Sequence, residues 1–182
     1  MTDIIPRVVA QCVYCKAQGL DSSEWIDAED ATSIEIADVH VHNPENFTDL
    51  CDDFTIIDQE GMFDEVIDME LEDIEEWAKA IQDVESDAPF DADVYLEFCN
   101  DMNVTSPIGY KKLMEAYQGR YEDFADFAYT YYMETYWDDI PSFLRKHINW
   151  ESVAQEMDKD GFFHYKEFGK PYEVYVFNSM IF

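Results

Sequence analysis

Hydrophobic residues recur every three or four positions in the middle of the chain, and this spacing predicts amphipathic helices. Between Phe63 and Val84 the repeat forms one apolar face, made of Leu71, Ile74, Ala78, Ile81 and Val84. Pro89 prevents this helix from continuing. The run DVYLEFCNDM, residues 93–102, predicts a second and shorter helix.

The N-terminal part shows alternation of apolar and polar residues instead, which predicts strands. The alternating runs are RVVAQCVY (7–14), TSIEIADVHVH (32–42) and DFTIID (53–58). They place mixed strands before the helical middle of the chain.

The C-terminal third is aromatic and returns to helical spacing. Phe124, Phe127, Ala128 and Tyr131 fall on one predicted helix face. Pro141 suits the first turn of another helix, and Asn149 is a good N-cap for a third. Two alternating runs around FGKPY then predict a β-hairpin. The chain is therefore predicted to be an α+β protein, with aromatic helices and a hairpin at its C-terminus.

Charge is the most unusual property of the sequence. The 182 residues contain 42 Asp plus Glu against 11 Lys plus Arg, a net charge of −31. From Ala17 to Tyr110 there are 28 acids and a single base, Lys79. This negative charge argues against direct binding to nucleic acid or to an anionic membrane, because both carry negative charge themselves. Disorder is disfavoured because 47% of the residues are hydrophobic.

Several other classes of protein lack support in the sequence. No run is long and apolar enough to span a membrane, and the N-terminus lacks the features of a signal peptide. The cysteines are therefore expected to be reduced, in the cytoplasm. Phosphate-binding and hydrolase motifs are missing, and carboxylate pairs arise by chance in so acidic a chain. We expect neither an enzyme nor a cofactor.

Two local motifs suggest metal binding. Cys12 and Cys15 form a C-x-x-C that could join His40 and His42 at zinc. Residues three apart in a strand point to opposite faces, so buried structural cysteines are the favoured interpretation. The second motif has EF-hand spacing, but a hairpin follows it where an EF-hand needs a helix. Its residues are Glu156, Asp158, Asp160, Gly161 and Glu167. Calcium binding stays open as the alternative function.

The acidic surface has three possible meanings. It is a solvated face, an adaptation to high salt, or an imitation of a polyanion. Salt adaptation would spread the acids evenly, and the segment with Lys79 as its single base argues against that. Duplex DNA carries one negative charge per about 1.7 Å, and a helix rises about 1.5 Å per residue. A helix with acids at most outward positions is thus a candidate DNA mimic.

Three stretches of the sequence resemble the ArdA family of antirestriction proteins. They are IPSFLRKHINWESVAQEMDKDGFFHY (140–165), FTIIDQEGMF (54–63) and FADFAYTYYMETYWDDIP (124–141). The segment before Phe54 is less similar, although Gly19 and Trp25 match the family's glycine and aromatic positions.

The resemblance implies an elongated chain of three small α+β domains, here bounded as 1–62, 63–105 and 106–182. It also implies a homodimeric DNA mimic that occupies the DNA groove of type I restriction-modification enzymes, on their methyltransferase core. A mimic of another basic protein is the remaining alternative. The acids expected to bind the partner are Glu65, Asp68, Glu70, Glu72, Asp73, Glu75, Glu76, Asp83, Glu85, Asp87, Asp91, Asp93, Glu97 and Asp101. The residues expected at the dimer contact are Ile140, Pro141, Phe143, Leu144, Ile148, Trp150 and Val153.

Overall fold

The computed structural model describes residues 5–62, 67–166 and 172–182. Contacts within the chain divide it into two compact units. Unit 1 contains Met1–Asp87 and Thr105–Pro107, and unit 2 contains Ala88–Val104 and Ile108–Phe182. The division into three domains stays a prediction. No helix in the described residues is long and apolar enough to cross a bilayer.

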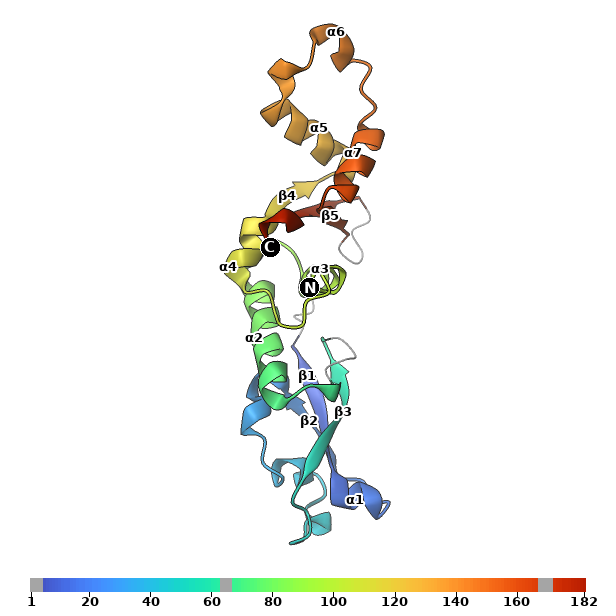
Figure 1. Cartoon of the computed structure of the whole chain (residues 1–182). Helices are drawn as coiled ribbons and strands as arrows, with labels where there is room; N and C mark the ends of the chain where they lie inside the picture. The colour runs from blue at the N-terminus through green and yellow to red at the C-terminus, as the bar shows by residue number, and fades with distance from the viewer. Residues whose placement is uncertain (1–4, 63–66, 167–171) are drawn as a thin grey trace. The chain divides into compact units, whose positions relative to one another are not determined.

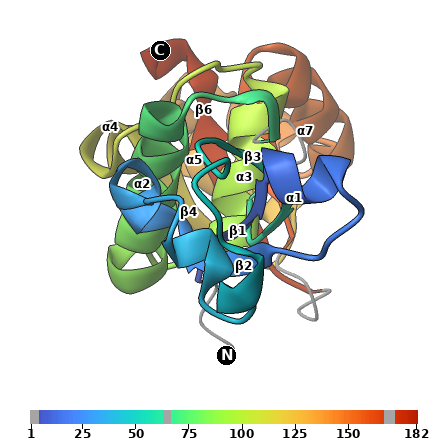
Figure 2. The same cartoon turned by 90° about the horizontal axis from the view of Figure 1, so that it is seen from below.

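Unit 1 is built on an antiparallel sheet with the strand order β2-β1-β3 (Figure 1). Its regular elements are β1 (Arg7–Cys12), α1 (Val13–Ala17), β2 (Ser23–Asp27), β3 (Phe54–Glu60) and α2 (Leu71–Asp87). The segment between β2 and β3 contains short 3-10 helices, which are η1 (Ala28–Ser33), η2 (Asp38–His40) and η3 (Pro44–Asn46). Helix α2 packs along η1, as Figures 1 and 2 both show.

The strand predicted over residues 32–42 is wrong. Thr32 and Ser33 end the 3-10 helix η1, and Asp38–His40 form the 3-10 helix η2, so this described segment contains no strand. The side chain of Asp38 accepts a hydrogen bond from the Glu35 N–H at 2.9 Å, which closes a turn there. Alternation alone therefore misled the prediction, while the predicted strand at 53–58 is confirmed as β3.

Unit 2 contains a second antiparallel sheet, with the order β4-β6-β5. Its strands are β4 (Tyr117–Tyr121), β5 (Phe162–Tyr165) and β6 (Val174–Asn178), and β5 pairs with β6 as the predicted hairpin. The helices are α3 (Ala92–Asp101), α4 (Tyr110–Ala116), α5 (Phe124–Thr135), α6 (Ser142–Arg145) and α7 (Trp150–Lys159). Two more 3-10 helices are η5 (Trp137–Asp139) and η6 (Ser179–Ile181).

The central strand β6 is buried on both faces. Phe177 stacks on Phe98 of α3, with 4.8 Å between ring centroids, while Val174 and Val176 join the cluster formed by α5 and α7. Alternate side chains of a strand face opposite ways, so one short strand supplies both halves of the core. The predicted N-cap is confirmed, because the Asn149 side chain accepts a hydrogen bond from the Ser152 N–H at 3.0 Å.

Candidate functional site

Helix α2 separates its residues into an apolar face and an acidic one. Ile74, Trp77, Ala78, Ile81 and Val84 are buried. The outward positions of the helix carry exposed carboxylates, and one more exposed acid lies just before the helix. We call this set the α2 acidic face; it consists of Glu70, Glu72, Asp73, Glu76, Asp83 and Asp87. The helix begins at Leu71, later than the predicted Phe63, and residues 63–66 are outside the described part of the chain.

Glu75 differs from these acids because it is bound within unit 1. Its carboxylate pairs with Lys79 one turn along the helix and accepts hydrogen bonds from the backbone N–H and the hydroxyl of Thr32 in η1. The hydrogen bond from Lys79, followed by that from Thr32, lowers the pKa of Glu75 to about 2. Glu75 therefore fastens α2 to η1 and is not an open contact for a partner.

The other predicted binding acids are in varied surroundings. Asp68 is exposed, Glu85 is half-buried, and Glu65 is outside the described residues. In unit 2, Asp93, Glu97 and Asp101 are exposed along one side of α3, and Asp91 at its N-cap is half-buried.

Two of the α3 acids are perturbed by their neighbours. Burial, followed by the charges of Asp101 and Asp93, raises the pKa of Glu97. The Tyr165 hydroxyl donates a hydrogen bond to Asp101 at 2.9 Å. Asp101 is thus partly engaged within unit 2, which sequence reasoning did not indicate.

The residues predicted at the dimer contact surround α6. Phe143 and Leu144 are 69% and 44% exposed, and Pro141 is also exposed. Ile140, Ile148, Trp150 and Val153 are half-buried. We call these seven residues the α6 surface.

Arg145 holds the chain before α6 in place. Its guanidinium donates to the carbonyl oxygens of Ile140 and Trp137 at 2.9 and 2.7 Å, and it lies 4.1 Å from the centroid of the Trp137 ring. The exposed apolar side chains of α6 are therefore presented by an anchored segment.

The EF-hand-like segment has a different structure from an EF-hand. Strand β5 follows Gly161 where the motif needs an exiting helix. Glu156 pairs with Lys159 and Asp158 with His164, and Glu167 is outside the described residues. Gly161 has a φ of +91°, which suits a turn between a helix and a strand.

The structure corrects the interpretation of the C-x-x-C motif. The chain leaves the strand at Cys12, and Cys15 lies in helix α1, so both side chains turn the same way. They meet His40 and Cys51, whereas His42 is exposed and pairs with Glu24. Burial raises the pKa of the Cys15 thiol to about 11. At Cys51 burial also raises the pKa, but the hydrogen bonds from Thr48, Cys12 and Cys15 together outweigh it and the net pKa is lowered.

Sequence comparison supplies a family. The family model described as antirestriction protein (ArdA) matches residues 14–170, a span that includes all of α2 and the whole α6 surface. No sequence match to a curated protein accompanies it. Because the match extends over most of the chain, this protein belongs to the ArdA family of antirestriction proteins.

Proposed function

We propose that this protein inhibits type I restriction-modification enzymes by occupying their DNA-binding groove, on the methyltransferase core, in place of DNA. Membership of a family of antirestriction inhibitors supports the target. The observation that supports the proposed mechanism is the α2 acidic face. Its carboxylates are exposed on one side of the helix, and the opposite side is apolar and buried. Competition is sufficient for inhibition, and no catalytic group is needed. The target acts on DNA inside the cell, so the cytoplasm is the proposed site of action.

The charge of α2 has a magnitude that can be compared with DNA. The 17-residue helix carries seven acids and one base. At about 1.5 Å per residue it is about 25 Å long, so it has roughly one net charge per 4 Å. Duplex DNA has one per about 1.7 Å. Helix α2 alone therefore supplies less than half the linear charge density of DNA, and the other acids of the chain must contribute to the mimicry.

The chemistry of a DNA groove favours carboxylates. Proteins grip the DNA backbone with Lys and Arg side chains placed for phosphate oxygens. A carboxylate meets the same side chains through charge-assisted hydrogen bonds, which are often bidentate with Arg. Opposite fields also accelerate association. Both effects weaken as the salt concentration rises, because salt screens interactions between charges. The binding of DNA to the same groove depends on salt in the same way.

We propose that a second copy of the chain covers the α6 surface. Phe143 and Leu144 are large, apolar and exposed beside the bases Arg145 and Lys146. A molecule at −31 should resist self-association except where bases relieve the repulsion. Light scattering should give twice the 21.4 kDa chain mass, and Phe143→Asp should give the monomer. A wild-type monomer at micromolar concentration would exclude this contact.

The function is tested with a purified type I enzyme and unmodified DNA that contains its site. The protein should suppress cleavage, and the inhibition should weaken with rising salt. In a gel-shift experiment it should displace DNA from the enzyme without shifting DNA alone. Plating unmodified phage on cells that carry the restriction system, with and without this protein, gives the cellular result. A shift of free duplex DNA would contradict the mimicry.

A further inference from the structure

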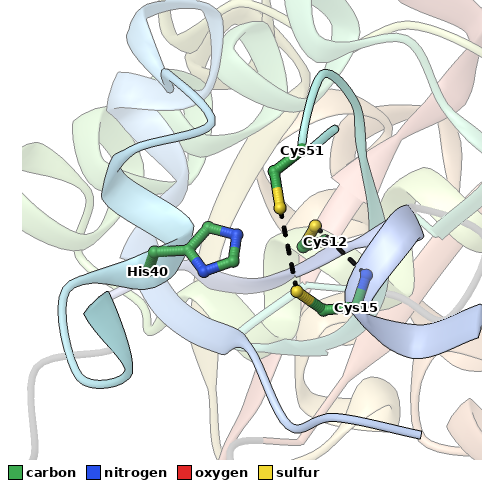
Figure 3. Close-up of side chains that lie close together, drawn as sticks. All are labelled: Cys12, Cys15, His40 and Cys51. Carbon is green, nitrogen blue, oxygen red and sulfur yellow. Dashed lines mark hydrogen bonds between the residues drawn. The ribbon is translucent and has the colours of Figure 1, made fainter. Parts of the chain in front are cut away.

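Four potential metal ligands from separate parts of the sequence meet in the interior of unit 1. They are Cys12 at the end of β1, Cys15 in α1, His40 in η2 and Cys51 before β3. Their ligand atoms all lie within 4.8 Å of one another, and all four residues are buried. Figure 3 shows the His40 ring directed toward the three thiols.

His40 is the most informative member of this cluster. It is only 2% exposed, and neither of its ring nitrogens has a hydrogen-bond partner. Its ring contacts that of Phe47, with 5.1 Å between the centroids, and this contact satisfies no ring nitrogen. Buried polar groups are almost always paired, so an unpaired imidazole beside three sulfurs calls for a ligand.

The spacing of the sulfurs fits a tetrahedral metal ion. The Cys15 and Cys51 Sγ atoms are 3.8 Å apart. With Zn–S bonds of about 2.3 Å, a regular tetrahedron separates two sulfurs by about 3.8 Å. The two thiols are therefore already at the separation that a shared zinc ion requires.

The backbone around the cluster supports the same geometry. The Cys15 N–H points at the Cys12 Sγ across 3.5 Å, in the first turn of α1. The Thr48 hydroxyl is 3.7 Å from the Cys51 Sγ. Such outer donors orient metal-bound thiolates and stabilise their charge.

We propose that unit 1 binds one Zn²⁺ ion through Cys12, Cys15, Cys51 and His40. Three soft sulfur ligands and one imidazole in a tetrahedral arrangement are the donor set that zinc prefers. On binding, the three thiols release their protons to solvent and the neutral imidazole donates a lone pair. Because the protein fills all four positions, the site has no place for substrate and is structural.

The site would act as a clasp for an irregular segment. Between β2 and β3 the chain forms only 3-10 helices and turns, from Ala28 to Asp53. Long segments without helix or strand are uncommon inside compact units. His40 and Cys51 come from this segment, while Cys12 and Cys15 come from the sheet strand and the helix that follows it. One ion would tie the segment to the sheet, as structural zinc does in other small units.

A cobalt titration tests this site. The full-length protein is stripped of metal with a chelator, kept under a thiol reductant and titrated with Co²⁺. A tetrahedral thiolate site gives strong visible ligand-field bands and a near-ultraviolet charge-transfer band. We expect these bands to saturate at one equivalent and to disappear when Zn²⁺ is added. The melting temperature of the metal-free protein should rise with one equivalent of Zn²⁺.

Two pairs of matched variants locate the ligands. His40→Ala and Cys51→Ser should lose the cobalt spectrum and weaken Zn²⁺ affinity by about tenfold or more. His42→Ala and Cys99→Ser should retain both. His42 is the exposed neighbouring histidine, and Cys99 is a buried cysteine of unit 2.

Three results would overturn the proposal. The first is a wild-type cobalt spectrum that is weak and octahedral. The second is equal Zn²⁺ affinity for His40→Ala and the wild type. The third is a Cys15–Cys51 disulfide in unreduced protein that takes up no metal once it is reduced. The wild-type titration decides the question if either ligand variant fails to fold, which circular dichroism would reveal.

Discussion

Neutralising part of the α2 acidic face should weaken binding to the restriction enzyme more than it changes the stability of the fold. The change is Glu70→Gln, Glu72→Gln, Asp73→Asn and Glu76→Gln in one variant, which leaves Glu75 in its contacts with η1. Exposed ion pairs contribute about 0.2–1 kcal/mol each, so losing four costs about 1–4 kcal/mol of binding. At about 1.4 kcal/mol per factor of ten, the dissociation constant should rise from about fivefold to several hundredfold.

The expected effect on folding is limited because two terms oppose each other. Removing the Glu72–Glu76 repulsion, at a spacing of four residues, stabilises α2 by a few tenths of a kcal/mol. Glu72 and Asp73 lie in the first turn, where the helix dipole favours acids by about 0.3–1 kcal/mol. Because two such acids are neutralised, the net change should be a loss of about 2 kcal/mol or less, which lowers the melting temperature by about 8 °C or less.

A matched variant controls for net charge. Glu115→Gln, Glu122→Gln, Glu134→Gln and Asp139→Asn remove the same number of exposed acids from unit 2. Inhibition of DNA cleavage and melting temperature are measured for both variants and the wild type. The α2 variant should lose inhibition far more than the control does. If both variants inhibit equally, α2 is not the main contact, and if the α2 variant inhibits like the wild type, the reasoning is refuted.

Three further changes test contacts that stabilise the inside of each unit. Glu75→Gln should lower the melting temperature at neutral pH. Since the wild-type pKa is lowered from 4.5 to about 2, that stabilisation is present above pH 4.5 and is lost toward pH 2, so the two melting curves should converge there. Asn149→Ala removes the cap on Ser152 and should cost about 1 kcal/mol in denaturant unfolding. Gly161→Ala combines a φ of +91° with a new Cβ 2.9 Å from the Ser179 hydroxyl, and should cost about 1–3 kcal/mol in the same experiment. An unchanged unfolding midpoint in either variant would contradict the corresponding contact.

Helices could be predicted from the sequence where the hydrophobic residues fall on one face of the helix, because that arrangement leaves a regular spacing in the sequence. The spacing of Ile74, Ile81 and Val84 predicts α2, and these side chains are buried in the structure. The strands β2 and β4 were missed because each is short and half-buried, so neither has a clear alternation of apolar and polar residues. Their place is set by pairing with distant strands, which local pattern does not encode.

The candidate sites show the same limit at the level of single residues. The acids of α2 are visible in the sequence, but the special role of Glu75 depends on Thr32, which is far away along the chain. The strand pattern of residues 7–14 continues two residues past Cys12, where β1 ends, so it does not predict the helix that brings Cys15 into the cluster. The signal available in the sequence is that a C-x-x-C, His40 and Cys51 all fall between residues 12 and 51. These residues meet only because of the turns of η2 and η3. The alternation of apolar and polar residues over 32–42 predicts a strand there instead.

The position of β6 in the chain has a consequence for synthesis. This strand lies between β4 and β5 in the sheet, yet it follows both of them in the sequence. A ribosome adds about 5–20 residues per second, so several seconds separate the appearance of β4 from that of its partner. During that interval Phe98 of α3 and Phe127 of α5 lack the strand that covers them. Unit 1 can fold while the nascent chain grows, but unit 2 must wait for β6, and its aromatic core is the more exposed to chaperones and to aggregation.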